Sequence, residues 1–542
     1  MKKYILFLFF TVLLTSCNTR VDFIVHNAKV YTTNRDMDVA SAFAVKDGKF
    51  IAVGDESLLD EYQTSNLVDA QGLPVYPGFI DAHCHFLSLG LTQTQVQLEG
   101  TKSYEEVIER VKAYADAAES RQVILGRGWD QNDWENKEFP TKDALDRLFP
   151  DIPVALRRID GHALLVNQKA LDLAGINGDT QVPGGTVVTK NGQPTGVLID
   201  TPMELVEAIL PKPTLEEKKQ ALVAAQEIGF KYGLTTVDDA GLNKEDILLI
   251  DSLQQTGVLD MRVYAMISNT PDNLDYFLPK GPLVTDRLSV RSVKVYADGA
   301  LGSRGAALIA PYSDAPKHRG KFITDKDSLK QLAARIAKTK FQMNTHAIGD
   351  AANQAVIDVY RDNVRLLRDP RWRVEHAQVL DAPDIEKFST KIIPSIQPLH
   401  ATSDMYWAGD RLGEDRLKNA YAYQEQLDYA GIVALGTDFP VEKVNPMLTF
   451  YAAISRRDLN GFPEEGFQRE NRLSRGSALL GMTRWAAYAN FEEKQKGSIE
   501  IGKVADFVML DRDIMEVTHR LIPGARVVAT FLNGKIVYSN RD

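Results

Sequence analysis

The sequence has few cysteines and no apolar run long enough to span a membrane. Only Cys17 and Cys84 occur in 542 residues, too few for a disulfide framework. The nearly unbroken apolar run at 4–14 is shorter than the roughly 20 residues of a membrane-spanning helix. No lysine- and arginine-rich stretch stands out and the net charge is −10, so no nucleic-acid partner is expected. With 44% hydrophobic and 25% charged residues, the composition is that of a globular protein with a large core.

The first residues have the pattern of an export signal. Two lysines precede the apolar run, and Leu14-Thr15-Ser16-Cys17 follows it. A positive start, a short apolar segment and small residues are typical of a cleaved signal peptide. The ending resembles a bacterial lipobox, so we expect residues 1–16 to be removed and a lipid on Cys17 to anchor the protein to a membrane. An exported lipoprotein of the periplasm or outer membrane would result; a plain secretory signal is the alternative.

Short strands are predicted at both ends of the chain. Asp47-Gly48 and Asn533-Gly534 each separate two apolar segments, a pattern typical of β-hairpins. A β segment of this size is not stable alone. We therefore expect residues 17–76 and 491–542 to form one small β-sandwich together.

Between these ends, residues 77–490 alternate apolar strands with charged, helical stretches. Eight strands are expected, at about 79–86, 233–239, 261–268, 290–297, 341–346, 372–377, 391–397 and 432–438. This alternation predicts an α/β fold with a parallel (β/α)8 TIM barrel. The gap between the first two strands is far longer than one helix requires. We expect residues 90–215 to form an inserted α/β subdomain on the catalytic side of the barrel.

Histidine and aspartate recur at the predicted carboxyl ends of the strands, where TIM barrels carry their catalytic groups. His83 and His85 alternate along the first strand and so share one face, where two imidazoles can hold a metal ion. His346, His376 and Asp438 end later strands. Each alone is compatible with a hydrogen-bonded core residue, but their recurrence on four strands favours a metal centre.

A lysine lies inside the predicted fourth strand. Lys294 follows Val293 and precedes Val295, and a buried lysine is unusual. It could be held in an ion pair. Alternatively, burial lowers its pKa and makes the neutral amine available. A neutral amine can add CO2 and become a carbamate, which is an oxygen ligand.

Taken together, these segments resemble the amidohydrolase superfamily of metal-dependent hydrolases, and within it the YtcJ-like, N-substituted formamide deformylase branch. The resemblance spans essentially the whole chain after the leader. It is carried by residues 76–85 (YPGFIDAHCH), 294–305 (KVYADGALGSRG), 346–350 (HAIGD), 375–378 (EHAQ) and 437–440 (TDFP), and also by 160–163 (DGHA) in the insertion and 497–506 near the end.

The resemblance implies a metal centre with six ligands. His83, His85 and Asp438 would hold one metal, His346 and His376 a second, and a carbamate on Lys294 would bridge them. Zinc is expected because the site is rich in imidazole; manganese and iron are alternatives, and a single-metal site would need fewer ligands. Asp438 is the expected catalytic residue, which takes a proton from the attacking water and passes it to the leaving amine.

Five further residues are candidates for contact with the substrate, each with a structural role as its alternative: His162, Asp298, Arg304, Gln378 and His400. We expect a small-molecule substrate with a non-peptide C–N bond, in an amide, an N-formyl or N-acyl amine, or a cyclic amide, cleaved by metal-activated hydroxide. Since a fold does not fix a function, the same metal barrel could act as an esterase, lactonase, phosphotriesterase or isomerase. A non-catalytic ligand-binding lipoprotein is a further alternative, and a homo-oligomer is left open.

Overall fold

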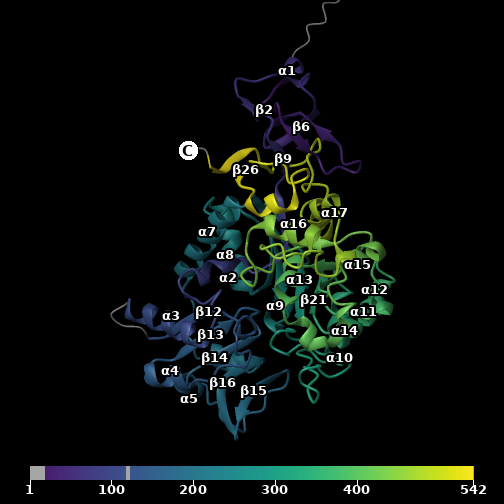
Figure 1. The fold of residues 1–542 in the computed structure, drawn as a ribbon. Coiled ribbons are helices and arrows are strands. Elements are labelled where there is room, and N and C mark those ends of the chain that lie inside the picture. The colour runs from purple at the N-terminus through teal and green to yellow at the C-terminus, as the bar shows by residue number, and fades with distance from the viewer. Residues whose placement is uncertain (1–18, 118–121, 541–542) are drawn as a thin grey trace, which may run out of the picture.

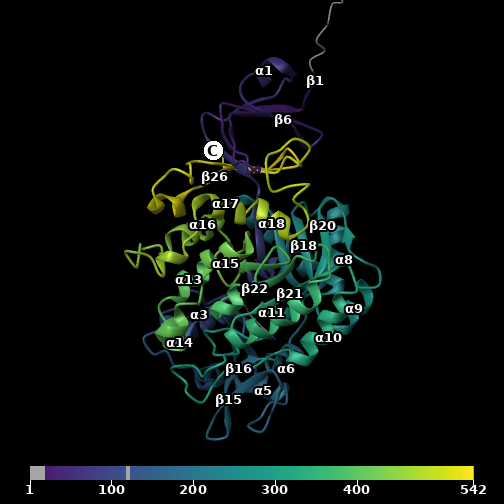
Figure 2. The same cartoon turned by 90° about the vertical axis from the view of Figure 1, so that its right-hand side faces the viewer.

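The protein has three parts, which Figures 1 and 2 show in two views. The computed structural model describes residues 19–117 and 122–540. The expected signal peptide and Cys17 lie outside the described residues. Within the described part, no helix has both the length and the apolar character to cross a membrane.

A parallel sheet of eight strands forms the centre, and its strands are arranged in the order of the sequence. They are β10 (Phe79–Cys84), β17 (Leu234–Leu242), β18 (Arg262–Ser268), β20 (Leu288–Tyr296), β21 (Gln342–Ala347), β22 (Trp372–His376), β23 (Ile392–Ile396) and β24 (Ala434–Leu435). Just beyond β24, backbone hydrogen bonds connect the last strand segment to the first: Asp438 N donates to His83 O at 2.7 Å, and His85 N donates to Phe439 O at 2.7 Å. The predicted TIM barrel is confirmed.

Helices cover the outside of the barrel. Strand β20 illustrates why: Val293 and Val295 belong to the buried apolar core, whereas Lys294 between them is turned into the barrel, as strand alternation requires. Helix α7 begins with a capping box, in which Thr214 and Glu217 satisfy each other's backbone N–H groups. The helices are α7 (Leu215–Lys231), α8 (Lys244–Gln255), α9 (Pro271–Phe277), α10 (Lys326–Ile336), α11 (Asp350–Val364), α12 (Ala382–Ile385), α15 (Tyr423–Ala430), α16 (Pro446–Ser455), α17 (Arg475–Gly481) and α18 (Arg484–Ala489).

A second sheet lies between β10 and α7 in the sequence. Its order is β11 (Val96–Gln97), β12 (Ile124–Trp129), β13 (Val154–Arg158), β14 (Ala163–Val166), β16 (Gln193–Asp200) and β15 (Gly185–Lys190). Apolar side chains of α3 (Tyr104–Asp116) and α4 (Asp143–Leu148) belong to one core of this sheet, and those of α5 (Gln168–Leu173) and α6 (Met203–Glu207) to another. This inserted part therefore has cores of its own.

Both ends of the chain build a β-sandwich. One sheet has the order β6 (Lys49–Gly54), β5 (Ala42–Lys46), β2 (Phe23–His26) and β8 (Leu67–Asp69); the other has β27 (Lys535–Ser539), β26 (Val527–Leu532), β25 (Phe507–Leu510), β9 (Pro74–Pro77), β3 (Lys29–Tyr31) and β4 (Val39–Ala40). Phe507 stacks on Phe531 at 4.1 Å between ring centroids, and Phe43 meets Phe507 edge-on. Since β9 leads directly into β10, the sandwich lies at the amino end of the barrel strands, away from the inserted part (Figure 1).

Candidate metal centre

The carboxyl ends of the barrel strands bring the predicted histidines together. His83 comes from β10, His346 from β21 and His376 from β22. The centroid of the His376 ring lies 4.8 Å from that of His83 and 4.6 Å from that of His346. All three side chains are buried. His83 thus forms one imidazole cluster with two histidines that lie more than 250 positions later in the sequence.

The orientation of His83 is fixed by a carboxylate behind it. His83 Nδ1 lies 2.5 Å from Glu375 Oε2, and Arg373 Nε lies 2.7 Å from Glu375 Oε1. Burial and the positive charge of Lys294 lower the pKa of His83 to about 4, so the ring is neutral and Nδ1 carries the proton. Nε2 is left with a lone pair directed into the site, an arrangement typical of metal-binding histidines.

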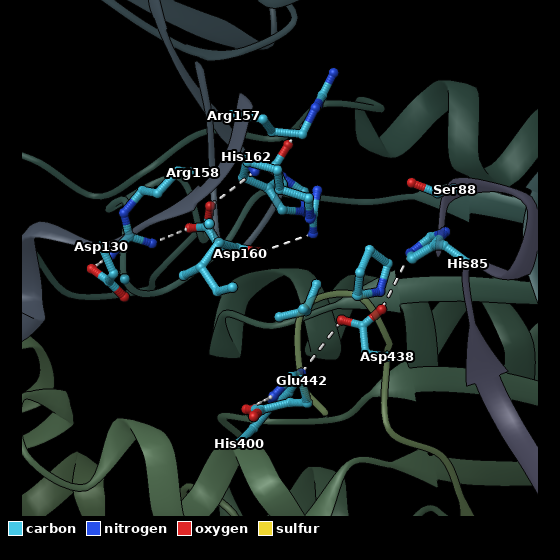
Figure 3. A pocket seen from close by; sticks show the side chains of 18 of the residues that line it. His85, Ser88, Asp130, Arg157, Arg158, Asp160, His162, His400, Asp438 and Glu442 are labelled. Carbon is cyan, nitrogen blue, oxygen red and sulfur yellow. Dashed lines mark hydrogen bonds and ion pairs between the residues drawn. The ribbon is translucent and has the colours of Figure 1, made fainter. Parts of the chain in front are cut away.

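Asp438 lies among three imidazoles. Its Oδ1 is 3.2 Å from His85 Nε2 and 3.6 Å from His83 Nε2, and its Oδ2 is 3.4 Å from His400 Nε2; Figure 3 shows the carboxylate between His85 and His400. Burial raises the pKa of Asp438, but His400 and His85 outweigh burial and lower it well below its usual value. The backbone of Asp438 is left-handed, with φ of 63°, an uncommon conformation that clusters at functional sites.

The other two histidines of the strand ends are held from behind. His376 Nδ1 lies 2.7 Å from Gln397 Oε1, and His346 Nε2 is 3.5 Å from Gly299 O. Burial lowers the pKa of both His376 and His346 well below the usual value. Both rings are therefore neutral, which is the form that binds a metal.

His400, which follows β23, faces a carboxylate at each ring nitrogen. Its Nδ1 lies 2.9 Å from Glu442 Oε1, and its Nε2 faces Asp438. Burial lowers the pKa of His400, but the two carboxylates outweigh burial and raise it to about 10. His400 thus holds Asp438 and Glu442 on the same side of the site.

The donor atoms fit a divalent metal ion. Two sets of residues each offer three ligand atoms that lie within 4.8 Å of one another. One set is His83, His85 and Asp438, and the other is His376, His400 and Asp438. The first set, two imidazoles with a carboxylate, consists of ligands that zinc and related metals prefer. In the second set the raised pKa of His400 keeps its ring protonated, so His400 serves that set as a hydrogen-bond donor to Asp438 and not as a metal ligand. In addition, the buried Oδ1 of Asp438 accepts no hydrogen bond of good geometry among the described residues. His346 is in neither set, although its ring adjoins that of His376.

Lys294 lies beside this cluster without a counter-ion. Its Nζ is 3.0 Å from His83 Nε2 and 4.8 Å from the centroid of the Tyr296 ring. Burial lowers the pKa of Lys294 to about 8. No carboxylate within the described ranges lies within ion-pair distance of it, so the geometry does not supply the ion pair that a purely structural lysine would have.

A cavity of about 680 Å³ opens over the cluster, which is room for a small molecule. Its floor is the barrel, with His85, His376 and Asp438. The opposite wall belongs to the inserted part; Figure 3 shows Arg157 and His162 on that side.

The five substrate-contact candidates divide into two groups. His162, Gln378 and His400 line the cavity. His162 Nδ1 lies 2.7 Å from Asp200 Oδ1, and the His162 ring is 4.9 Å from that of His346. Gln378 donates to Tyr421 Oη at 2.9 Å.

Asp298 and Arg304 do not line the cavity. The buried carboxylate of Asp298 accepts hydrogen bonds from three backbone N–H groups, at 2.8 Å from Ala307, 3.0 Å from Ile348 and 2.8 Å from Gly349. The guanidinium of Arg304 pairs with Asp314 at 2.9 Å. The structure thus gives both residues partners in the loops around the site.

Sequence reasoning gave no role to several side chains at the site. Glu375, which orients His83, precedes the predicted ligand His376 in the sequence. An acidic residue beside a predicted ligand is a pattern from which a role at the site could have been predicted. Glu442 lies four positions after Asp438. Arg127 and Arg157, in contrast, belong to the inserted sheet, and nothing in their local sequence tells which face of that sheet meets the barrel.

Comparison with known proteins agrees with the geometry. Residues 66–538 match the sequence profile of the Amidohydrolase family. The chain is 32% identical to Protein LONG AFTER FAR-RED 3 of Arabidopsis thaliana, over 95% of this chain and 91% of that protein. It is 30% identical to putative amidohydrolase YtcJ of Bacillus subtilis (95% and 98%) and 24% identical to N-substituted formamide deformylase of Arthrobacter pascens (95% and 98%).

A solved structure leads to the same conclusion. An uncharacterized metal-dependent hydrolase from Pyrococcus horikoshii superposes with a TM-score of 0.74 at 28% identity, over 92% of this chain and 99% of that one. Residues 1–18 match a prokaryotic membrane lipoprotein lipid attachment site. The resemblance found in the sequence is confirmed: the chain belongs to the amidohydrolase family and is a metal-dependent hydrolase.

Proposed function

We propose that the protein hydrolyses a non-peptide C–N bond, in an amide, an N-formyl or N-acyl amine, or a cyclic amide. The observation that carries this proposal is Asp438, an ionised and buried carboxylate within 3.6 Å of three imidazoles on the floor of the cavity. Such a group can take a proton from water and return it to a leaving nitrogen.

The proposed metal ligands are His83, His85 and Asp438 for one ion, His346 and His376 for a second, and Lys294 as a bridging carbamate. Zinc is the proposed metal, because imidazole dominates the ligand set. When bound, such ions lower the pKa of water to about 7 and polarise a carbonyl oxygen.

The protein's own residues supply proton transfer and positioning. Asp438 accepts the proton of the attacking water and delivers it to the amine as the C–N bond breaks, which is general acid–base catalysis by a single carboxylate. His400 holds Asp438 from the side opposite His85. Glu375 keeps the His83 ring in the tautomer that offers Nε2. His162 and Gln378 line the cavity and would contact the substrate from its wall.

The bond type is supported by one relative over nearly its whole length. The relative from Arthrobacter pascens is named an N-substituted formamide deformylase, and a formamide is cleaved at a C–N bond. The floor of the cavity in this chain, with the carboxylate of Asp438 among three imidazoles, suits hydrolysis of that bond.

We also propose that the protein is exported and anchored through a lipid on Cys17, in the periplasm or outer membrane. The match at residues 1–18 supports the attachment site. The first described strand, β1 (Thr19–Arg20), pairs with β7 (Tyr62–Gln63) in the terminal β part. The anchor would therefore hold the sandwich near the membrane, with the cavity at the other end of the barrel, open to solutes.

A substrate screen with purified protein tests the reaction. The screen covers N-formyl and N-acyl amines, cyclic amides, lactones and phosphotriesters, with metal content measured on the same sample. We expect turnover of one of the C–N classes, lost on chelation and restored by zinc. Turnover confined to lactones or phosphotriesters, or undiminished by thorough metal removal, would contradict the proposal.

A further inference from the structure

A buried arginine in the cavity wall lacks a counter-ion. Arg127 lies near the end of β12 and is 9% exposed. Its one hydrogen bond among the described residues runs from Nη2 to Ile159 O at 2.9 Å, while its buried Nε donates to nothing. No carboxylate of the described chain lies within ion-pair distance of it. A guanidinium has five N–H donors, so most of the binding capacity of Arg127 is unused.

A second arginine stands beside it. Arg127 and Arg157 are register partners on the parallel strands β12 and β13, so their side chains leave the same face of the sheet. Both line the cavity. Arg157 is paired with Glu207 and also donates to Gly161 O at 3.0 Å. Of these two cations, Arg157 therefore has a carboxylate partner and Arg127 has none among the described residues.

The charge of Arg127 persists at neutral pH. Burial and the neighbouring Arg157 lower the pKa of Arg127 only to about 10, so the group stays protonated. A buried charge without a partner is unfavourable, and like charges on adjacent strands add to this. An anion bound from the cavity would relieve both effects.

Resting on the proposed hydrolase function, we propose that Arg127 is a specificity residue that binds a carboxylate carried by the substrate, at the end remote from the bond that is cleaved. A guanidinium matches a carboxylate with two parallel hydrogen bonds. A single charge fits better than a phosphate dianion, because the second arginine is already neutralised and Glu204 and Glu207 line the same cavity.

The test compares matched substrates. A ladder of ω-(formylamino)alkanoates is assayed beside counterparts in which the carboxylate is replaced by a hydroxymethyl group. The metal-loaded wild-type protein is compared with Arg127→Gln, Arg127→Lys and the surface control Arg335→Gln, which removes an exposed arginine of α10 that pairs with Asp275. Probes that are turned over give kcat and KM, and probes that are not turned over give Kd by calorimetry.

We expect the wild-type protein and Arg335→Gln to favour the carboxylate probe by about tenfold to a hundredfold, as for hydrogen bonds to charged groups. Arg127→Gln should lose that preference while its affinity for the neutral probe is unchanged, and Arg127→Lys should retain part of it. Because the removed charge is buried and unpaired, Arg127→Gln should keep or raise the Tm of the ligand-free protein. A merely structural arginine would lower it.

Three outcomes would overturn the proposal: equal affinity of the wild-type protein for both probes, an unchanged preference in Arg127→Gln, or stronger competition by inorganic phosphate than by the carboxylates. These results are separable from failure of the proposed function. Carboxylate binding that depends on Arg127, without turnover of any probe, would retain the subsite and reject the hydrolase reaction. Turnover with no preference for the carboxylate probe would retain the hydrolase reaction and reject the subsite.

Discussion

Among the described residues, each of the two walls of the cavity contains a buried cation that lacks a carboxylate partner, and the two cations differ in chemistry. Lys294 lies in the barrel wall beside His83, and Arg127 lies in the inserted wall beside Arg157. An amine can be converted to an anionic carbamate, so a lysine can become part of the metal centre. A guanidinium stays charged and can be balanced only by an anion from outside. Under the two proposals made above, metal and CO2 would complete the barrel wall, whereas the substrate would complete the inserted wall.

The largest effect is expected in the barrel wall. Asp438→Asn removes the group that moves the proton, so kcat should fall by about a thousandfold or more, while some metal stays bound by the histidines. Turnover kinetics and metal analysis on the same sample check this. The surface substitution Asp327→Asn serves as the control, because that side chain is 86% exposed. Full activity in Asp438→Asn would refute the assigned role.

A smaller effect is expected behind the ligands. Glu375→Gln replaces the carboxylate that orients His83 with a neutral amide and should lower metal affinity by about tenfold to a hundredfold. A competition titration with a chelator measures this affinity.

The matched control for Glu375→Gln is Asp506→Asn. It breaks another buried arginine–carboxylate pair, Arg262 Nε to Asp506 Oδ2 at 2.6 Å, where the barrel meets the sandwich. Asp506→Asn should lower the free energy of unfolding without changing metal affinity. Equal loss of metal affinity in both variants would show that Glu375 acts only through stability.

In the inserted wall, His162→Gln should reduce kcat/KM by about fivefold, since one hydrogen bond to the substrate amounts to about 1 kcal/mol. Metal content should not change, because His162 is held by Asp200 and lies outside the ligand sets. Steady-state kinetics with metal analysis decide the point. Loss of metal from this variant would contradict this role and indicate that His162 is a metal ligand.

The smallest effect is expected outside both walls. Arg304 is engaged with Asp314 and does not line the cavity. Arg304→Ala should leave kcat/KM within about twofold of wild type and lower stability by at most about 1 kcal/mol, as for other partly exposed ion pairs. A tenfold change in KM would contradict this expectation and indicate that Arg304 contacts the substrate.

The sequence predicted the barrel well because strand–helix alternation is a local signal. It also placed His83, His346 and His376 at strand ends. The details beyond the strands were less accessible: β10 ends at Cys84, so His85 lies beyond the strand, and β24 covers only Ala434–Leu435. Asp438 is positioned by a left-handed backbone and by the hydrogen bond of its N–H to His83 O, which residue patterns do not reveal.

The inserted wall could not be predicted because its contribution depends on how one folded part docks on another. Arg127 and Arg157 are ordinary strand residues by pattern. They line the cavity side by side because β12 and β13 pair in this register and because this face of the sheet is turned to the barrel. Asp298 shows the opposite case: it follows a catalytic strand, but backbone N–H groups engage its carboxylate.

The most direct test of the barrel-wall account is metal content together with intact mass of the purified protein, before and after acid treatment. About two divalent metal ions per chain, as in bridged two-metal sites, and an acid-labile mass increment of one CO2 that disappears in Lys294→Ala are the predicted result. A protein that binds no metal under metal-replete conditions would contradict the account.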